Sequence, residues 1–320
     1  MSFLKMETVN ISVVSGAVMT LLFMVLVGYF IRKINFINDT ASKQLSTLVI
    51  NVGQPFMFFG ALLKNEYSPE LLKKGLLIIV VGLAVHVILA ALAFVFSKCW
   101  RDQNERKILE FSMIFANCAF IGFPILEAAF GSKGLFYGSF YVISFNIFMW
   151  SYGMVILGRG RNDIKVSPVK MVLNYGTTPC LIGLALYIWQ LKPPTFIMSG
   201  ASYIGSICTP LSTFVIGSLL ASMPIKEIFN NVKIYLFSFF KLIVMPMVVV
   251  LIAKLVGLDS EMIYIAAIMS ALPTAANTAM FAEVYDIKPK LAAHAVGMSS
   301  LLSPIAVPIV LFLTRLVIGE

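Results

Sequence analysis

The chain contains ten long apolar stretches, five before and five after a basic linker from Arg159 to Lys170. A bilayer core about 30 Å thick is crossed by roughly 20 apolar residues in a helix, and each stretch reaches or approaches that length. The fourth stretch of each half is interrupted, within residues 115–131 and 270–286. Because five is odd, two similar halves would enter a bilayer in opposite senses, as in inverted-repeat transporters with a site at the repeat interface.

Composition places the chain in a membrane. Hydrophobic residues make up 59%, charged residues 12%, and the mean hydropathy is +0.93, which leaves too little polar surface for a soluble globule of 320 residues. A transmembrane barrel would show alternation over about ten residues in each strand, and these runs do not alternate. We therefore expect an all-α polytopic membrane protein.

The hydropathy pattern predicts both the spans and the division of the chain. The ten expected spans are Ile11–Ile31, Gln44–Leu63, Leu76–Phe96, Ile108–Phe130, Leu135–Leu157, Met171–Trp189, Tyr203–Ser222, Ile234–Val256, Met262–Val284 and Leu291–Val317. Residues 1–157 form the first five-helix repeat, residues 158–170 the linker, and residues 171–320 the second repeat, inverted relative to the first.

Lysine and arginine predict the orientation. Of the 24 basic residues, 15 lie in the connections after spans 1, 3, 5, 7 and 9, 8 lie at the termini or in the other connections, and Lys241 lies inside the eighth span. By the positive-inside rule the first group is cytoplasmic, so both termini are extracellular or periplasmic and the protein is multi-pass in the plasma (inner) membrane. The net charge of +9 is then explained by anionic lipid headgroups, without a nucleic acid.

The two interruptions are the strongest indication of a site. They contain Asn117, Gly122 and Pro124 in the fourth span and Pro273, Thr274, Asn277 and Thr278 in the ninth. Proline frees backbone groups that hydrocarbon cannot satisfy, and Pro124 is suited to begin a half-helix whose N–H groups favour an anion. A single kink would indicate packing, but two at the same ordinal place, each with a carboxamide, favour a binding site.

These residues resemble a known family. The run N-C-A-F-I-G-F-P from Asn117 to Pro124, and the run A-L-P-T-A-A-N-T-A-M-F-A-E-V-Y-D from Ala271 to Asp286, are similar to the fourth and ninth helices of the auxin efflux carrier family. That family includes bacterial organic-acid carriers and plant pin-formed auxin carriers. The resemblance extends over the whole chain, whose short central linker is typical of bacterial members.

The resemblance implies an architecture similar to that of the sodium/bile acid symporters. Helices 1, 2, 6 and 7 would form a scaffold, and helices 3–5 and 8–10 a transport domain that moves like an elevator, with broken helices 4 and 9 crossing. A homodimer through the scaffold helices is a candidate assembly.

The resemblance also assigns roles to residues. Asn117 takes the position of the carboxylate-binding asparagine, and Gly122 and Pro124 shape the crossover. Where plant members have a crossover proline in helix 9, this chain has Thr278, preceded by Asn277. A polar patch in the second span resembles the scaffold side of the family's pocket: Asn51, Gln54 and Pro55.

Ionisable residues within spans are expensive and usually functional. Lys241 in the eighth span either reaches the interface as a lipid-facing side chain or lies inward as a cation that partners a carboxylate. Glu127 and Glu283, near the ends of helices 4 and 9, favour interfacial solvation over site chemistry. His294 suits a structural hydrogen bond better than proton coupling, and Asn146 suits interhelical packing better than a pocket wall.

The expected cargo is a small mono- or dicarboxylate, such as malate, malonate or an auxin-like acid, because the site has neutral donors and no arginine clamp. Export or uptake, and coupling to H⁺, Na⁺ or the membrane potential alone, stay open. An enzyme is disfavoured because the chain has no H-E-x-x-H, G-x-S-x-G or phosphate loop, and no cofactor or metal is expected. An anion channel is the main alternative, and a membrane-embedded sensor is a weaker one.

Overall fold

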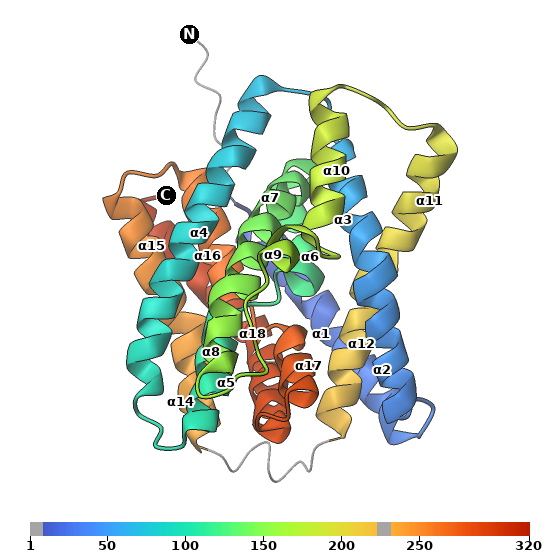
Figure 1. The fold of residues 1–320 in the computed structure, drawn as a ribbon. Helices are drawn as coiled ribbons and strands as arrows, with labels where there is room; N and C mark the ends of the chain where they lie inside the picture. Colours follow the sequence, from blue (N-terminus) through green and yellow to red (C-terminus); the bar gives the residue numbers. More distant parts are fainter. Residues whose placement is uncertain (1–8, 223–231) are drawn as a thin grey trace.

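The computed structural model describes residues 9–222 and 232–320. Every regular element in those two ranges is a helix, and one isolated β-bridge accompanies them (Figure 1). An all-helical fold is therefore confirmed for the described residues.

The helices of the first half are α1 (Ile11–Lys33), α2 (Asp39–Leu48), α3 (Gln54–Leu63), α4 (Pro69–Ser97), α5 (Gln103–Ile114), α6 (Phe123–Phe130), α7 (Ser132–Phe148) and α8 (Met154–Gly158). Those of the second half are α9 (Pro168–Val172), α10 (Thr177–Ile188), α11 (Thr195–Ser206), α12 (Cys208–Ala221), α14 (Val232–Phe239), α15 (Met245–Leu255), α16 (Ser260–Ala271), α17 (Ala276–Val284) and α18 (Pro289–Ile318). Four short π-helical turns join some of them: η1 (Val49–Gly53), η2 (Cys118–Gly122), η3 (Met149–Gly153) and η4 (Phe240–Val244).

Seven helices in the described ranges are long and apolar enough to cross a membrane: Ile11–Lys33, Asp39–Leu63, Pro69–Ser97, Ser132–Gly158, Thr195–Ala221, Val232–Leu255 and Pro289–Ile318. Each overlaps an expected span, although the helix Thr195–Ala221 begins well before the expected Tyr203. The other three expected spans contain shorter apolar helices, because the fourth and ninth are broken and α10 has only 12 residues. The multi-pass class is thus supported, and the number of ten spans stays a prediction.

The expected sixth span, Met171–Trp189, is not one helix, because α9 ends at Val172 and α10 begins at Thr177. The cause is Asn174. Its side-chain oxygen accepts hydrogen bonds from the backbone N–H groups of Gly176 and Thr177, both at 2.9 Å. A side chain that satisfies nearby backbone groups in this way replaces the helical turn.

Three of the four π-turns have a proline as their local cause. Pro55, Pro124 and Pro246 each occupy the second position of the α-helix that follows a π-turn. A proline lacks the N–H donor and its ring clashes with the carbonyl four residues earlier, so the preceding turn widens. Pro55 and Pro124 therefore widen a helical turn near each of the two candidate-site segments of the first half, residues 51–55 and 117–124.

Small residues allow α1 and α12 to touch through their backbones. A Cβ atom added to Gly28 would lie 2.5 Å from the Cα of Phe214, and one added to Gly217 would lie 2.0 Å from the carbonyl oxygen of Val25. Such close approach is typical of helix pairs in membranes, where packing and not hydrophobicity drives association. These two helices therefore form a tightly joined pair.

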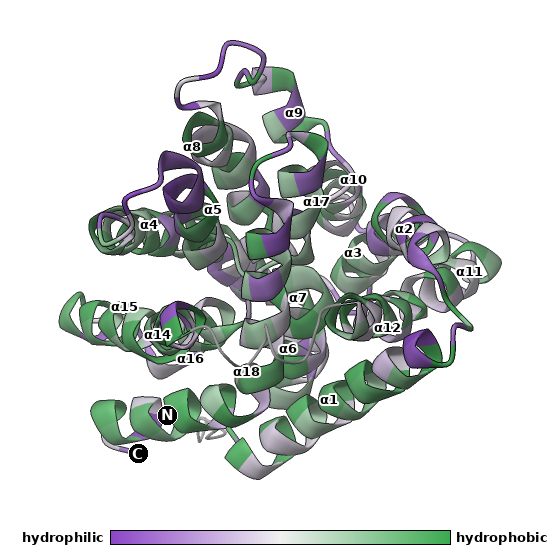
Figure 2. Cartoon of the chain, turned by 90° about the horizontal axis from the view of Figure 1, so that it is seen from below, coloured by the Kyte–Doolittle hydropathy of each residue, from purple (hydrophilic) through white to green (hydrophobic). Residues whose placement is uncertain are grey.

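The connections alternate between the two ends of the bundle. In Figure 1 the connections 34–38 and 98–102 lie at the lower end, and the connections 64–68 and 189–194 lie at the upper end. Figure 2 shows hydrophobic residues along the outer helices and hydrophilic residues mainly in connections and helix ends. Exposed large side chains such as Phe23, Val80 and Ile305 lie on these outer faces, as expected for a surface that contacts lipid.

Candidate functional site

The two interrupted segments meet in the interior of the protein. Between α5 and η2, and again between α16 and α17, a few residues leave the helical conformation and pair as an antiparallel bridge between Ala116 and Thr274. The backbone N–H of Asn117 donates to the carbonyl of Pro273 at 2.8 Å, and the N–H of Ala275 donates to the carbonyl of Phe115 at 2.9 Å. Each break thus supplies partners for polar groups that the other exposes. We call this region the crossing.

Thr274 links the crossing to two other helices through hydrogen bonds. Its hydroxyl donates to the carbonyl of Ser112, in the last turn of α5, at 3.0 Å. Its backbone N–H donates to the hydroxyl of Ser299 on α18, also at 3.0 Å. Thr274 is completely buried, so these bonds replace water for a carbonyl that has no partner at the end of its helix. The prediction that Thr274 contacts substrate remains untested, and the structure shows a structural contact.

The second break has an obvious local cause. Pro273 cannot extend α16, and the residue before it, Leu272, adopts an extended conformation with ψ of 150°, as proline favours in its predecessor. The break therefore lies at residues 272–275, and Asn277 and Thr278 lie in the first turn of α17. Pro273 is therefore the proline of the crossing, and Thr278, which stands where plant members have a crossover proline, lies after it in α17.

Asn117 begins the second half-helix of the first break. Its side-chain oxygen accepts a hydrogen bond from the N–H of Phe120 at 3.2 Å and so caps η2. The residue is 3% exposed, and its amide nitrogen has no hydrogen-bond partner among the described residues. A buried donor without a partner costs about 1–3 kcal/mol. The Nδ2 group of Asn117 is therefore a donor that a ligand could satisfy.

The second break presents a comparable set of donors. The hydroxyl of Thr278 is buried and also lacks a partner in the described part of the chain. The first turn of α17 has no side-chain cap, so its N–H groups and the positive end of the helix dipole are directed to the crossing. Asn277 is partly buried, and its amide nitrogen lies 3.9 Å from the sulfur of Met149 in η3, which is a weak contact.

Gly122 packs closely against the side chains at the end of α16. A Cβ atom there would lie 2.8 Å from Cδ1 of Leu272 and 3.2 Å from the sulfur of Met269. Even alanine would thus push against the end of α16. The sequence singled out Gly122, and the structure gives the steric reason for glycine at that position.

Comparison with known proteins identifies the chain. A model of the family described as membrane transport protein matches residues 13–311. The chain belongs to this family, the auxin efflux carriers. The family resemblance drawn from residues 117–124 and 271–286 is confirmed.

Similar proteins extend over nearly the whole carrier. An uncharacterized transporter of Methanocaldococcus jannaschii is 24% identical over 293 residues, which is 89% of this chain and 94% of the relative. The uncharacterized transporter YfdV of Escherichia coli K12 is 21% identical over 315 residues, 94% of this chain and 98% of the relative. A Rhizobium meliloti protein named "Putative malonate transporter" is 21% identical over 312 residues, 94% of this chain and 96% of the relative. The family and these names indicate a transporter and not an enzyme.

Lys241 of this auxin efflux carrier family protein lies inside the bundle. It sits in η4, its side chain is fully buried, and its ammonium donates to the carbonyl of Ser270 at 3.4 Å. Of the two alternatives raised by the sequence, the inward position agrees with the structure and the lipid-facing position does not. The partner is a backbone carbonyl, and none of the described carboxylates lies within 4.0 Å.

No described hydrogen bond or ion pair joins the other ionisable candidates of the carrier to the described residues of the crossing. Glu127 forms an exposed ion pair with Lys64 at 3.5 Å, and Glu283 forms one with Lys43 at 3.7 Å. Both arrangements fit interfacial solvation, and neither tests a role in coupling. His294 is half-buried in the second turn of α18, and no hydrogen bond joins it to the described residues of the crossing.

The polar patch of the second span is not joined to the crossing by a described hydrogen bond. Asn51 lies in η1 and is exposed, and Gln54 and Pro55 begin α3 and are half-buried. One turn later the ring of Phe58 packs on the ring of Phe123 in α6, with centroids 5.1 Å apart. The place of Asn51, Gln54 and Pro55 in a pocket therefore stays a prediction, supported by this ring contact between α3 and α6.

The sequence analysis did not anticipate the buried carboxylate of Glu110. Glu110 of α5 is completely buried and accepts hydrogen bonds from both terminal nitrogens of Arg159, one of them at 2.8 Å, and from the hydroxyl of Tyr152 at 3.1 Å. Bidentate pairs of this kind are strong and geometrically specific. The available signal was a glutamate just inside the fourth span, with an arginine directly after the fifth.

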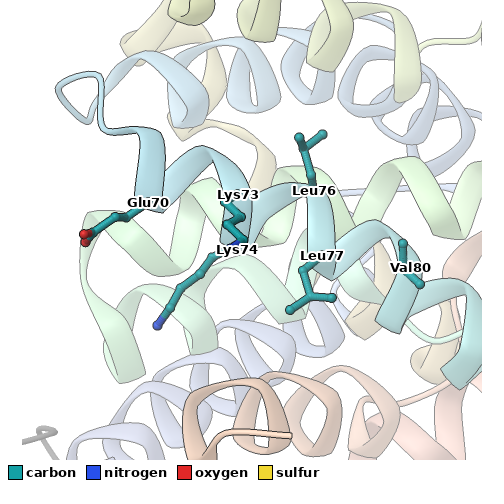
Figure 3. A pocket seen from close by; sticks show the side chains of 6 residues that line it. All are labelled: Glu70, Lys73, Lys74, Leu76, Leu77 and Val80. Carbon is teal, nitrogen blue, oxygen red and sulfur yellow. The ribbon is translucent and has the colours of Figure 1, made fainter.

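A groove of about 580 Å³ lies along the outside of α4 (Figure 3). Its lining residues are Glu70, Lys73, Lys74, Leu76, Leu77 and Val80. Lys74 forms an ion pair with Glu261 and lies 4.0 Å from Asp259. The groove includes no residue of the crossing, so it is not the candidate site of this carrier.

Proposed function

We propose that the protein is a secondary transporter that carries a small organic anion, a mono- or dicarboxylate, across the plasma membrane. The observation that carries the proposal is the buried Nδ2 group of Asn117, which has no partner among the described residues and lies at the crossing of two broken helices. Neutral donors of this kind suit a carboxylate, whose charge they stabilise by short hydrogen bonds.

A carboxylate at the crossing would be held by groups from both breaks. Asn117 would donate from its amide, Thr278 from its hydroxyl, and the uncapped first turn of α17 from its backbone N–H groups. Helix N-termini favour anions because their N–H groups and dipoles both point to the ligand. Asn277 would form part of the same wall, beside Met149.

Movement of the crossing as an elevator would explain how the anion changes sides. In support, α1 packs on α12 and α3 packs on α10 and α11, whereas α4 packs on α5 and α7 and α16 packs on α15 and α18. These contacts support the division into scaffold and transport domain that the family resemblance implies, and α1 also packs on α6 and α18, across the proposed boundary. Two inverted five-helix repeats, each broken in its fourth span, would generate this arrangement.

The choice of substrate follows from the chemistry of the site. The name of the Rhizobium meliloti relative refers to malonate, a small dicarboxylate, which agrees with a site that has neutral donors. We propose malonate, malate or an auxin-like acid as substrates.

We also propose that the connections after the odd spans are cytoplasmic. A cysteine at Ser167 should then be shielded from an impermeant thiol reagent in intact cells, and one at Lys192 should be labelled.

The proposal is tested by counterflow in liposomes. Purified protein should accumulate labelled malonate or another small carboxylate against unlabelled substrate inside, with saturation, whereas a channel would show neither property. Asn117→Ala should weaken binding roughly ten- to a hundredfold, because a hydrogen bond to a charged group contributes about 1.5–3 kcal/mol. The matched control is Asn146→Ala, since the buried amide of Asn146 already donates to its own helix at Val142. Equal effects of the two substitutions would contradict the site.

A further inference from the structure

Lys241 is a buried cation that takes no part in the hydrogen bonds of the proposed carboxylate site. It lies near the middle of the long span Val232–Leu255 and is 0% exposed. Its one described hydrogen bond, to the carbonyl of Ser270, is long at 3.4 Å. No acidic side chain in the described ranges forms an ion pair with it. A buried ammonium without an acid is strongly disfavoured, so its retention calls for a physical reason.

The position of Lys241 links it to the crossing. Ser270 belongs to the last turn of α16, and Pro273, three residues later, accepts the hydrogen bond from the backbone of Asn117. Lys241 is also within electrostatic range of Cys118, the next residue after Asn117, and of His86 on α4. The cation thus lies next to the segment that carries the proposed carboxylate donor.

The helix end offsets only part of this charge. The carbonyl end of a helix carries about half a negative charge, so the end of α16 compensates Lys241 incompletely. Cys118 is neutral as a thiol, and the ring of His86 is held by the carbonyl of Gly82 at 2.6 Å and by surrounding aromatic rings. Without an anion, the crossing therefore keeps a net positive charge.

We infer that Lys241 is a permanent counter-charge for the transported carboxylate. The lysine moves with the crossing, and its charge neutralises one negative charge of the substrate. The inference rests on the proposed carrier function and concerns the same site. A crossing that holds a monoanion is then electrically neutral, and an empty crossing carries one positive charge. Lys241 acts on the substrate through its charge. The hydrogen bonds to the substrate come from Asn117, Thr278 and the first turn of α17.

This arrangement determines which step of transport the membrane potential affects. The total charge moved in a full cycle equals that of the substrate, because Lys241 returns with the empty carrier. Exchange of one substrate molecule for another uses only the loaded step. Exchange of a monoanion should therefore be insensitive to voltage, whereas exchange of a dianion should carry one net negative charge. Moving one charge through the field at 100 mV slows saturated exchange roughly threefold, because loaded carriers accumulate on one side.

The experiment measures saturated exchange in proteoliposomes with the potential clamped by potassium and valinomycin. Malonate, a dianion near neutral pH, is compared with its monomethyl ester, a monoanion of nearly equal size, and malate is compared with indole-3-acetate. In the wild-type protein the monoanion of a pair should exchange at the same rate at 0 and 100 mV, and the dianion about threefold more slowly at 100 mV.

Lys241→Gln removes the charge and should reverse the behaviour of monoanions. Their exchange should become voltage-dependent, and their apparent affinity should fall roughly tenfold, the Coulomb effect of a unit charge about 10 Å away at an effective dielectric constant of 20. Lys241→Arg, which keeps the charge, should keep voltage-independent exchange. The matched control is Lys254→Gln, which removes an exposed lysine from the end of the same span.

The outcomes separate the two proposals. Voltage-dependent monoanion exchange in the wild-type protein would overturn the counter-charge, and this result requires no variant to fold. Unchanged voltage dependence in a folded Lys241→Gln protein would also overturn it, while saturable exchange would still support the carrier. Absence of saturable exchange for all four acids would overturn the carrier function and the counter-charge together.

Discussion

The two breaks of the crossing have the same form and different chemistry. The first, between α5 and η2, contains no proline, and Asn117 caps the helix that follows it. The second, between α16 and α17, is caused by Pro273, and the helix that follows has no side-chain cap. The carbonyl end of α5 is closed by the neutral hydroxyl of Thr274, and that of α16 by the ammonium of Lys241.

This difference suggests a division of labour between the halves. The first break offers an oriented amide donor, which gives hydrogen-bond specificity. The second offers a bare helix N-terminus and a nearby cation, which give electrostatic attraction. Two segments with similar architecture thus need not contribute equally to a ligand, because capping and counter-charges are set by individual side chains.

The largest expected effect comes from placing a negative charge in the first break. Asn117→Asp preserves size but opposes the carboxylate of the substrate, so at neutral pH binding should weaken more than in Asn117→Ala, by over a hundredfold. Activity should recover in part as the pH falls and the aspartate is protonated. Counterflow as a function of pH measures this. Wild-type transport by Asn117→Asp at neutral pH would reduce Asn117 to a packing residue.

A bulky residue at Gly122 should separate the two breaks. Gly122→Val would clash with Leu272 and Met269 and should lower the free energy of unfolding by about 1–3 kcal/mol, the usual effect of overpacking. Unfolding in detergent measures the change. Leu272→Ala in the same chain should restore part of the loss, and Gly60→Ala, where no atom lies within 4 Å of the new Cβ, is the control. A valine without effect would show that the crossing is looser than described.

The hydroxyl of Thr274 should stabilise the crossing independently of substrate. Thr274→Val removes the hydrogen bond to Ser112 and leaves a buried carbonyl unpaired, which should cost about 1–3 kcal/mol. Thr274→Ser keeps the hydroxyl and should lose much less. Thermal unfolding without substrate distinguishes the two variants. If both lose the same stability, the methyl group and not the hydroxyl matters at this position.

The smallest effects are expected at the far ends of the half-helices. Glu127→Gln and Glu283→Gln each remove an exposed ion pair, and such pairs contribute about 0–1 kcal/mol. Half-saturation for the transported acid should change less than twofold in either variant. A large loss of transport in one of them would mean that the end of α6 or α17 participates in coupling. The functional difference between the two halves would then lie at these helix ends and not at the crossing.

Much of the candidate site was predictable because its signals are local. Pro273 interrupts its helix directly, Pro124 follows the π-turn that leads into α6, and Asn117 and Asn277 are conspicuous in apolar surroundings. The second break lies at Pro273, within the interruption that the sequence indicated, whereas Thr278, which stands at the family's crossover position, lies in the first turn of α17. The sixth span was predicted as one helix because hydropathy does not register the side-chain bonds of Asn174.

The sequence by itself determined the membrane class, the helical content, and the two segments in which helices break. These follow from apolar length and from proline, whose effects act within a turn or two. Only the tertiary structure decided that the first helix break falls at residues 115–117, where no local residue forces it. Thr274 and Ser112, which close that break, lie 162 residues apart in the chain.

The environment of each buried charge was likewise a tertiary matter. Lys241 could have faced lipid or the interior, and the positions of Glu110 and Arg159 at span ends did not by themselves determine that the two would pair. The physical reason is that the free energy of a charge depends on all the groups packed around it, and those groups come from helices that the sequence does not place next to one another.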